Sequence, residues 1–408
     1  MIQALFRFLK REQSAYQSLS AGGRRLLIST LLAGIAEPMS SAFSNAYLWR
    51  HLHSVPALVI WNTLFFVFLC VGFGLNGWLM RRYSLSRAFL IGCMIKGIVP
   101  FLLIIVRPEQ LTSVAILGAL LGLGGGFYWG SRNLFTLRKT SDRDRLYYGG
   151  LESVIGTAIN IVIPFLVGSA FLFANETHLA AVEIVYAVFA FAGFLFLCLS
   201  GLSMQGEPEQ DHAPRTLFIP KPSSRWNKLR LLEVVHGLHG GLETVIPTIM
   251  ILLLVGNEGA LGLISSLSAC IALVSTYVVG RLAKKHHRAN LLSIWIIVGL
   301  VGSLIFSIAY SSWSVLLYMG LVSVVGSTRW ITLASIMYDA VDQESGHASE
   351  HYAFIYDREI WLNVGRVLAL MLLLGLYALS PYWTIRLALV GGMLMQFFTY
   401  RLSRELSK

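Results

Sequence analysis

The chain has 408 residues, of which 56% are hydrophobic and 13% are charged, whereas charged residues make up about 25% of an ordinary soluble domain. This composition excludes a water-soluble globule and predicts an integral membrane protein. The net charge of +11 does not indicate nucleic-acid binding, because the basic residues lie in short clusters between apolar blocks, as the orientation of a membrane protein requires.

The chain starts with a short basic stretch, and we expect residues 1–24 to lie as an amphipathic segment on the cytoplasmic membrane surface. Twelve apolar blocks follow, each close to the roughly 20 residues that cross a hydrocarbon core of about 30 Å. They should be helices, because lipid offers no partners for backbone amides and a β-barrel would show alternation. The expected spans are 25–49, 56–80, 88–106, 111–137, 147–173, 179–202, 229–254, 259–280, 290–309, 314–337, 353–378 and 381–400.

One long hydrophilic stretch interrupts the apolar blocks. We expect residues 204–228 to form a cytoplasmic linker, because the four prolines in this stretch prevent it from continuing a helix. The linker separates an N-terminal half of six spans, residues 25–203, from a C-terminal half, residues 229–400. Residues 401–408 form a cytoplasmic tail.

Lys and Arg residues set the expected orientation. Arg50 and Arg107 are the two basic residues in the loops on one side of the membrane, and all other basic loop residues lie on the side of the two termini and the linker. Since cytoplasmic loops carry the excess of Lys and Arg, both termini are expected in the cytoplasm. We expect the bacterial cytoplasmic membrane as the location.

The two halves resemble each other in sequence. Residues 77–82, which leave the second span, match residues 280–285, which leave the eighth, at an offset of 203 residues, and the same offset superimposes Asn160 on Asn363. Repeated membrane halves are typical of secondary transporters, whose solute site lies between the repeats near mid-membrane.

Twelve spans, cytoplasmic ends, a long central loop and a Gly-x-x-x-charge-Arg/Lys signature after spans two and eight together resemble the major facilitator superfamily (MFS) over the whole chain. The resemblance implies two six-helix halves, with spans one, four, seven and ten around a central cavity. It also implies alternating access, with a cytoplasmic gate at the signature. Members usually have an acidic residue where this chain has Arg81 and Lys284, so the charge relay of the gate is expected to differ. The gate residues would be Gly77, Arg81, Arg82, Gly280, Lys284 and Lys285.

Charged residues inside the spans should pair, face the bundle interior or take part in function, since an isolated charge at mid-bilayer costs about 2.5–3.5 kcal/mol. We expect Arg132 to pair with Glu152, and Arg329 to pair with Glu359, near the cytoplasmic ends of adjacent spans. Lys96 is expected to be structural, because the third span lies outside the cavity in the fold that the chain resembles.

Glu37 and Glu243 occupy the middle of the first span of each half, and each is followed by a proline, Pro38 or Pro247. The resemblance places both spans at the cavity, where a carboxylate could take up and release a proton during transport. A structural hydrogen bond to a neighbouring span is the alternative for each. Of the two, Glu243 is the stronger candidate, because histidines share its face.

His236, His239 and Glu243 lie at positions i, i+3 and i+7, on one face of a helix. Two imidazoles and a carboxylate can hold a transition metal or relay protons, and a purely packed role is also possible. Proton handling is preferred, because no second cluster of ligands accompanies this face.

Two further sets of residues are candidates for solute contacts. Arg132 follows aromatic residues in the fourth span, and this combination suits a partly apolar anion. Arg329 and Trp330 repeat it in the tenth span. A polar stripe in the eleventh span should face the cavity or a neighbouring span. Its candidate site residues are Tyr356, Glu359, Asn363 and Arg366.

The favoured function is secondary transport of a small organic solute by alternating access, coupled to protons. Gly156, Pro164 and Gly168 loosely resemble the motif of the superfamily's exporters, which favours export. The expected partners are lipid, solute and protons, with no cofactor, metal or nucleic acid, and the chain is expected to be a monomer.

The alternatives are an importer of a metal or metal chelate that uses His236, His239 and Glu243, and a non-transporting receptor or membrane enzyme. An enzyme is disfavoured, because the sequence has no His-Glu-x-x-His motif, phosphate loop or nucleophile elbow.

Overall fold

A computed structural model describes residues 16–17, 19–140, 142–177, 179–206, 216–219, 221–282, 288–344 and 350–406. The described part consists of long helices and contains no strand. The helices are α2 (Ala21–Leu52), α3 (Val55–Leu79), α4 (Leu85–Val106), α5 (Leu111–Lys139), α6 (Asp142–Thr177), α7 (Leu179–Ser203), α8 (Ser224–Leu254), α9 (Glu258–Leu282), α10 (Arg288–Ala309), α11 (Ser312–Glu344), α12 (His351–Leu379) and α13 (Pro381–Leu406).

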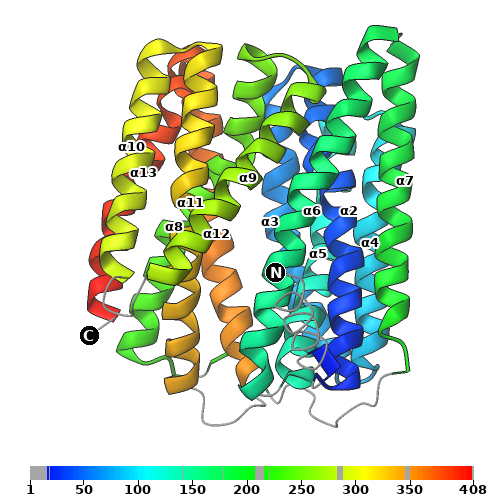
Figure 1. Ribbon diagram of the computed structural model, residues 1–408, viewed down its shortest axis with the longest axis vertical. Coiled ribbons are helices and arrows are strands. Elements are labelled where there is room, and N and C mark those ends of the chain that lie inside the picture. The colour runs from blue at the N-terminus through cyan, green and yellow to red at the C-terminus, as the bar shows by residue number, and fades with distance from the viewer. Residues whose placement is uncertain are drawn as a thin grey trace, which may run out of the picture.

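The expected all-α membrane fold is confirmed. Ten of the helices within the described residues are long and apolar enough to cross a membrane. The other two are α11, whose apolar part is limited to Ser312–Gly326, and α13. Both lie beside the other ten in the same bundle (Figure 1).

Several helices continue beyond the apolar blocks from which they were predicted. The clearest case is α8, which begins at Ser224 instead of residue 229. Ser223 caps it, because its hydroxyl accepts a hydrogen bond from the Trp226 backbone N–H at 3.0 Å, which satisfies one of the free donors of the first turn. Likewise α13 extends to Leu406, into the expected tail. Hydropathy therefore locates the part of a helix that lies in lipid, and the helix itself is longer.

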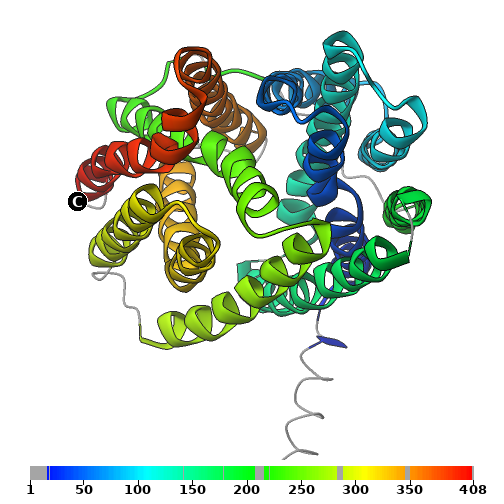
Figure 2. The ribbon, with the colours of Figure 1, turned by 90° about the horizontal axis from the view of Figure 1, so that it is seen from above.

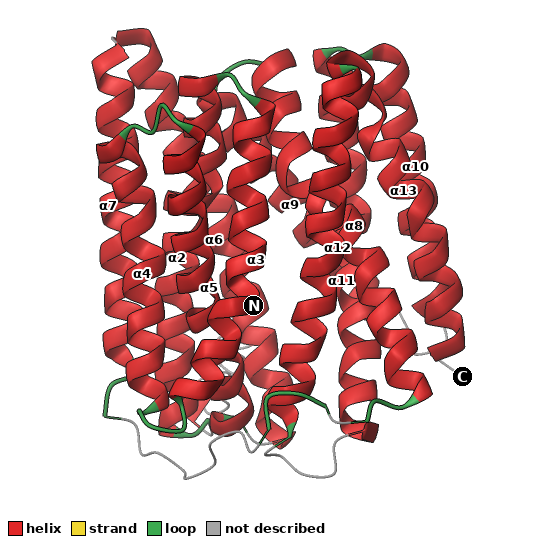
Figure 3. Cartoon of the chain, turned by 180° about the vertical axis from the view of Figure 1, so that it is seen from behind, coloured by secondary structure: helices red, strands yellow, loops and turns green. Residues whose placement is uncertain are grey.

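The helices form two groups, α2–α7 and α8–α13, which lie side by side (Figures 1 and 2). The main contacts between the groups are α3 with α12 and α6 with α9. We call the side where α3, α5, α7, α9, α11 and α13 end the linker face, and the other side, where α2, α4, α6, α8, α10 and α12 end, the opposite face. Figure 3 shows the same bundle from behind.

Helices α3 and α5 pack against each other through backbone as well as side chains. A methyl group built on Gly122 would lie 2.2 Å from the Phe65 carbonyl oxygen, and one on Gly126 would lie 2.4 Å from that of Leu69. A methyl group on neighbouring Gly125 would meet side chains at ordinary contact distances, 3.5 Å from the Phe65 ring and 3.7 Å from Leu69 Cδ1. Part of the glycine run therefore permits close approach of these helices, as glycines often do between membrane helices.

This difference gives a test of the packing. Gly122→Ala should destabilise the purified protein by about 1–3 kcal/mol, because overpacking forces the two backbones apart. Gly125→Ala, the matched control, should be neutral or slightly stabilising, since alanine is the better helix former. Thermal unfolding in detergent measures both variants. An equal loss of stability in the two variants would contradict the packing described here.

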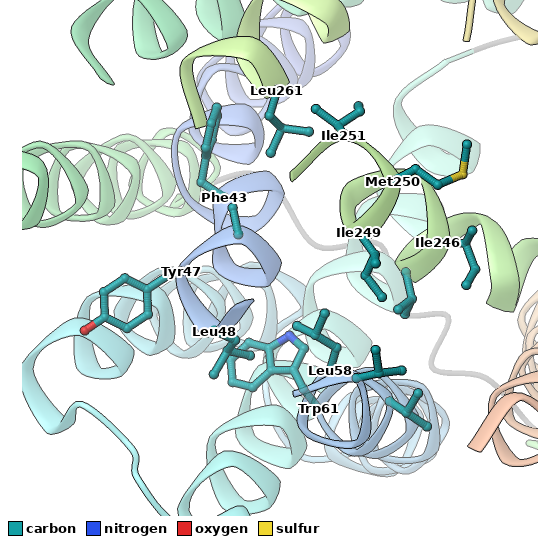
Figure 4. Close-up of a cluster of buried hydrophobic side chains, with 14 of the residues drawn as sticks. Phe43, Tyr47, Leu48, Leu58, Trp61, Ile246, Ile249, Met250, Ile251 and Leu261 are labelled. Carbon is teal, nitrogen blue, oxygen red and sulfur yellow. The ribbon is translucent and has the colours of Figure 1, made fainter. Parts of the chain in front are cut away.

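The opposite face is closed by apolar side chains from both groups of helices. Figure 4 shows this cluster, in which α2 and α3 contribute residues such as Phe43 and Trp61, and α8 and α9 contribute residues such as Ile249 and Leu261. All four side chains are buried. These side chains therefore pack the two groups of helices together towards the opposite face.

Candidate functional site

A cavity of about 650 Å³ lies between the two groups of helices, within the 300–1,000 Å³ range of small-molecule sites. Helices α2, α5, α8 and α11, the expected cavity helices, all contribute to its wall, together with α3, α4, α6 and α9. The wall combines aromatic, amide and hydroxyl side chains with one acidic and one basic residue. The lining residues are Glu37, Pro38, Phe43, Asn45, Trp61, Asn62, Phe65, Lys96, Leu121, Trp129, Asn160, Pro164, Thr244, Thr248, Leu261, Ser265, Ser268, Ala269, Ala272 and Ser323.

Glu37 and Lys96 form an ion pair in the cavity wall, between Glu37 Oε2 and Lys96 Nζ. The Lys96 side chain is 4% exposed and its ammonium lies 4.6 Å from the Tyr128 ring centre and 5.5 Å from that of Trp129. Glu37 is 48% exposed. The charge presented to the cavity is therefore the carboxylate, with the ammonium behind it.

The position of Lys96 corrects an expectation from sequence. The third span was expected to lie outside the cavity, with Lys96 in a structural role there. Its helix, α4, does pack on the outer side of α2 and α5, but a lysine has four methylenes and can carry its charge well away from its own backbone. Lys96 thus lines the cavity from an outer helix.

A chain of amides crosses the cavity from one group of helices to the other. Asn62 Nδ2 donates to Asn45 Oδ1 at 3.0 Å, and Asn45 Nδ2 donates to the Thr244 backbone carbonyl at 3.2 Å. Asn62 Nδ2 also donates to the Leu58 carbonyl at 2.8 Å. Sequence reasoning missed these residues, although an asparagine within a long apolar block was an available signal. The chain ties α8 to α2 and α3 beside the cavity.

A second contact joins the two groups at the opposite face. Arg50 Nη1 donates to both carboxylate oxygens of Glu258, at 2.9 and 3.1 Å. The Tyr186 hydroxyl donates a hydrogen bond to Glu258 Oε1 at 3.1 Å. We call these three residues the opposite-face lock. Arg50 had been counted only as one of two basic loop residues, and nothing in the sequence links it to Glu258.

One of the two expected ion pairs is present and the other is not. Arg132 and Glu152 contact each other between α5 and α6. The expected pair of Arg329 with Glu359 is replaced by two others. Arg329 Nη1 lies 2.9 Å from Glu243 Oε2. Glu359 Oε1 lies 2.6 Å from Arg358 Nη1. The reason is the helix order, because α11 packs against α8, α9 and α10, whereas α12 packs against α8, α3 and α13. The acidic partner of Arg329 therefore comes from α8.

The two histidines of α8 have different acidic neighbours. His236 Nδ1 lies 3.6 Å from Glu233 Oε2, and His239 Nε2 lies 4.0 Å from Glu243 Oε1. Both imidazoles are buried. Within the described residues, no three His, Cys, Asp or Glu side chains gather closely enough to hold a metal ion. The geometry thus offers no support for the metal-transport alternative.

Comparison with known proteins agrees with this architecture. Residues 26–357 match the Major Facilitator Superfamily. The chain belongs to this superfamily. A relative in Bacillus subtilis (strain 168), an uncharacterized protein named YqgE, is 23% identical over 350 residues, which cover 85% of this chain and 80% of the relative.

Solved MFS-type structures share the fold. A POT family transporter superposes with a TM-score of 0.70 at 11% identity, covering 97% of this chain and 100% of that one. The nucleoside transporter NupG superposes with a TM-score of 0.69, also at 11% identity, covering 95% of this chain and 100% of its own. Family and fold together make this MFS protein a secondary transporter of a small solute.

The polar stripe of α12 faces the neighbouring helix α3 in this MFS protein. Tyr356 stacks on Phe73 with ring centres 6.3 Å apart, and the Arg366 guanidinium lies 4.8 Å from the Phe66 ring centre. Arg366 also donates to Asn363 Oδ1 at 3.0 Å. The stripe was expected to face either the cavity or a neighbouring span, and the structure favours the neighbouring span. The side chain of Trp330 lies outside the described residues.

The expected gate residues are only partly described. A methyl group on Gly77 would lie 2.7 Å from the Tyr352 ring and 2.4 Å from Leu217 of the linker, so this glycine permits α12 and the linker to pack on α3. The Arg82 guanidinium lies 4.9 Å from the Trp78 ring centre, and Arg81 follows α3 in a turn. Gly280 lies in α9. Lys284 and Lys285 are outside the described residues.

Proposed function

We propose that this MFS protein moves a small amphipathic organic solute in exchange for protons. The observation that supports this most directly is the cavity between the halves, into which Glu37 directs a half-exposed carboxylate. Aromatic residues from α2, α3 and α5 would bind the apolar part of the solute. The amides of Asn45 and Asn62 and the hydroxyls of Thr244 and Thr248 would bind its polar groups.

Glu37 is the residue to which we assign proton coupling, in preference to Glu243. With Glu37 ionised, the Glu37–Lys96 pair is neutral overall. Protonation of Glu37 would leave Lys96 without its counter-ion, so a proton would change the charge of the cavity in which the solute binds. Because a protein can shift between two states only when a ligand binds them differently, such a charge change would bias the transporter towards one facing. Glu243 is assigned a structural role as the partner of Arg329.

The linker face is assigned to the cytoplasm, because the loops on that side carry nearly all basic loop residues. An apolar cluster and the Arg50–Glu258 pair join the two groups towards the opposite face, and we assign the state described here to the form that receives solute from the cytoplasm. Export fits this assignment and the Gly156, Pro164 and Gly168 pattern of α6. We expect the transporter to act as a monomer in the bacterial cytoplasmic membrane.

Counterflow tests transport itself. A panel of small amphipathic cations, anions and neutral compounds is first screened for those that raise the unfolding temperature of the purified protein, since binding stabilises the folded state. Stabilising compounds are then assayed as radiolabelled solutes in proteoliposomes preloaded with the same unlabelled compound. Transient uptake supports the proposal. Binding without exchange, for every compound that binds, would show a receptor instead of a transporter.

Glu243→Gln separates a structural role from coupling. Arg329 is 5% exposed, and removing its carboxylate partner should weaken folding and transport together, because the loss of one member of a buried pair is costly. Counterflow and proton-driven accumulation should therefore fall by the same factor. The double variant Glu243→Gln with Arg329→Gln should recover part of both. If Glu243→Gln loses accumulation but keeps counterflow, coupling belongs to Glu243 and our assignment of Glu37 is wrong.

A further inference from the structure

Three hydroxyl groups in the wall of the central cavity already donate their only hydrogen within their own helix. Each one bonds the backbone carbonyl four residues earlier, at a distance between 2.6 and 2.8 Å. The three residues are Thr244, Ser265 and Ser323. Since a hydroxyl has one donor and two acceptor lone pairs, these groups can offer a solute only acceptors.

The amide of Asn62 is used in a similar way. Its Nδ2 donates to Asn45 Oδ1 at 3.0 Å and to the Leu58 carbonyl at 2.8 Å, and these two bonds use both hydrogens of the amide nitrogen. Asn62 lines the cavity and is left with the lone pairs of its oxygen. Hydroxyl and amide groups from α3, α8, α9 and α11 therefore make this wall rich in acceptors.

The exposed charge of the wall is also an acceptor. Lys96 is buried and bonds one oxygen of Glu37, whose side chain is half-exposed in the cavity wall. A carboxylate can accept about four hydrogen bonds, so this contact leaves Glu37 able to accept more. Arg132 lies near Trp129 but pairs with Glu152, and neither member of that pair lines the cavity. A solute therefore meets a negative charge among acceptors.

Lys96 shows how an ammonium group is held in this wall. Its Nζ bonds the Glu37 carboxylate and lies 4.6 Å from the Tyr128 ring centre and 5.5 Å from that of Trp129. The faces of aromatic rings attract cations within about 6 Å. Tyr128 is buried, but Trp129 is exposed and lines the cavity together with Glu37. Two of the groups that hold the lysine are thus also accessible to a solute.

We propose, on the basis of the transport function above, that the solute is an organic cation with N–H groups, a protonated amine or guanidine. Its N–H groups bind Glu37 and the neighbouring acceptors, and the Trp129 ring contacts its charge. Lys96 is a tethered ammonium that holds the same carboxylate when no solute is bound, so solute and lysine compete. Proton and solute then also compete for one carboxylate, which suits exchange.

Calorimetric titration of the purified full-length protein compares ligands that share a 4-phenylbutyl group and end in an amine, a guanidine, a trimethylammonium, a hydroxyl or a carboxylate. The amine and the guanidine should bind about tenfold more tightly than the others, because only they bring both positive charge and N–H donors to Glu37. Equal binding of the amine and any of the last three ligands, or no binding of the amine and the guanidine, would overturn the proposal.

Lys96→Met tests whether Lys96 competes with the solute. Methionine keeps an unbranched chain beside the two rings but removes the ammonium, so the amine should bind about tenfold more tightly. Glu37→Gln should weaken amine binding about tenfold and leave the alcohol unchanged, so counterflow of the amine then needs a higher concentration. Lys228→Met, the matched control, removes an exposed lysine at the linker face and should change neither. Unchanged or weaker amine binding in Lys96→Met, at an unaltered unfolding temperature, would show that Lys96 does not compete.

Counterflow of the ligand that binds best separates the solute class from transport itself. If the amine or the guanidine binds best and is exchanged, both proposals stand. If the alcohol or the carboxylate binds best and is exchanged, transport stands and the solute class is wrong. If the amine binds best and is not exchanged, the cavity is an amine site and the proposed transport is wrong.

Discussion

Glu37→Gln is expected to abolish proton-driven accumulation of the transported solute. One proton per cycle can sustain a concentration ratio of about tenfold per pH unit, because each factor of ten corresponds to about 1.4 kcal/mol. Glutamine retains the shape and most hydrogen bonds of Glu37 but cannot exchange a proton, so the ratio should fall to about one. Counterflow without a pH gradient should persist. Radiolabelled solute in proteoliposomes with an imposed pH gradient measures both.

Glu183→Gln is the matched control for this variant. Glu183 also belongs to an ion cluster, with His51 at 3.0 Å and Arg107 at 3.8 Å, but it does not line the cavity. Its replacement should leave the accumulation ratio unchanged. Because Glu37→Gln also removes the counter-ion of Lys96, the double variant Glu37→Gln with Lys96→Gln shows whether lost coupling or a buried charge causes the defect. Accumulation at the wild-type ratio in Glu37→Gln would remove this residue from coupling.

The sequence predicted the membrane fold well because the relevant physics is local. Backbone groups in lipid must bond within their own helix, so a long apolar block can be recognised without knowing its neighbours. Helix ends outside lipid follow other rules. The start of α8 at Ser224 depends on one capping hydroxyl, which a hydropathy pattern does not contain.

The site was predicted less well, because charge pairing depends on which helices are neighbours. Arg132 and Glu152 lie on consecutive helices that are joined by a short connection, and their contact could be predicted. Arg329 was assigned to the next helix in the chain, whereas α8 is the helix that it faces. The Arg50–Glu258 pair joins residues 208 positions apart, a relation that no local pattern carries.

The opposite-face lock is the second place where a single change should have a large effect. Glu258 lies on α9, at the start of its helix, and is 3% exposed. Its two partners, Arg50 of α2 and Tyr186 of α7, both belong to the other group of helices. Any state that opens a path to the opposite face between α2, α7 and α9 must separate these groups, and the lock therefore favours the closed arrangement.

Glu258→Gln should consequently shift the transporter towards the state that is open at the opposite face. Loss of one partner from a fully buried pair costs about 3–5 kcal/mol. Arg50 is 24% exposed, so we expect about 2 kcal/mol, or a roughly 30-fold change in the equilibrium between the two states.

Spin labels on cysteines that replace Glu109 and Ser312, in a background without the four native cysteines, report this opening as longer distances. Glu405→Gln, which removes the exposed pair with Lys228 at the linker face, should leave the distances unchanged. The charge-swapped variant Arg50→Glu with Glu258→Arg should recover part of the short distances. A distance distribution in Glu258→Gln identical to that of the wild type would show that the lock does not control opening.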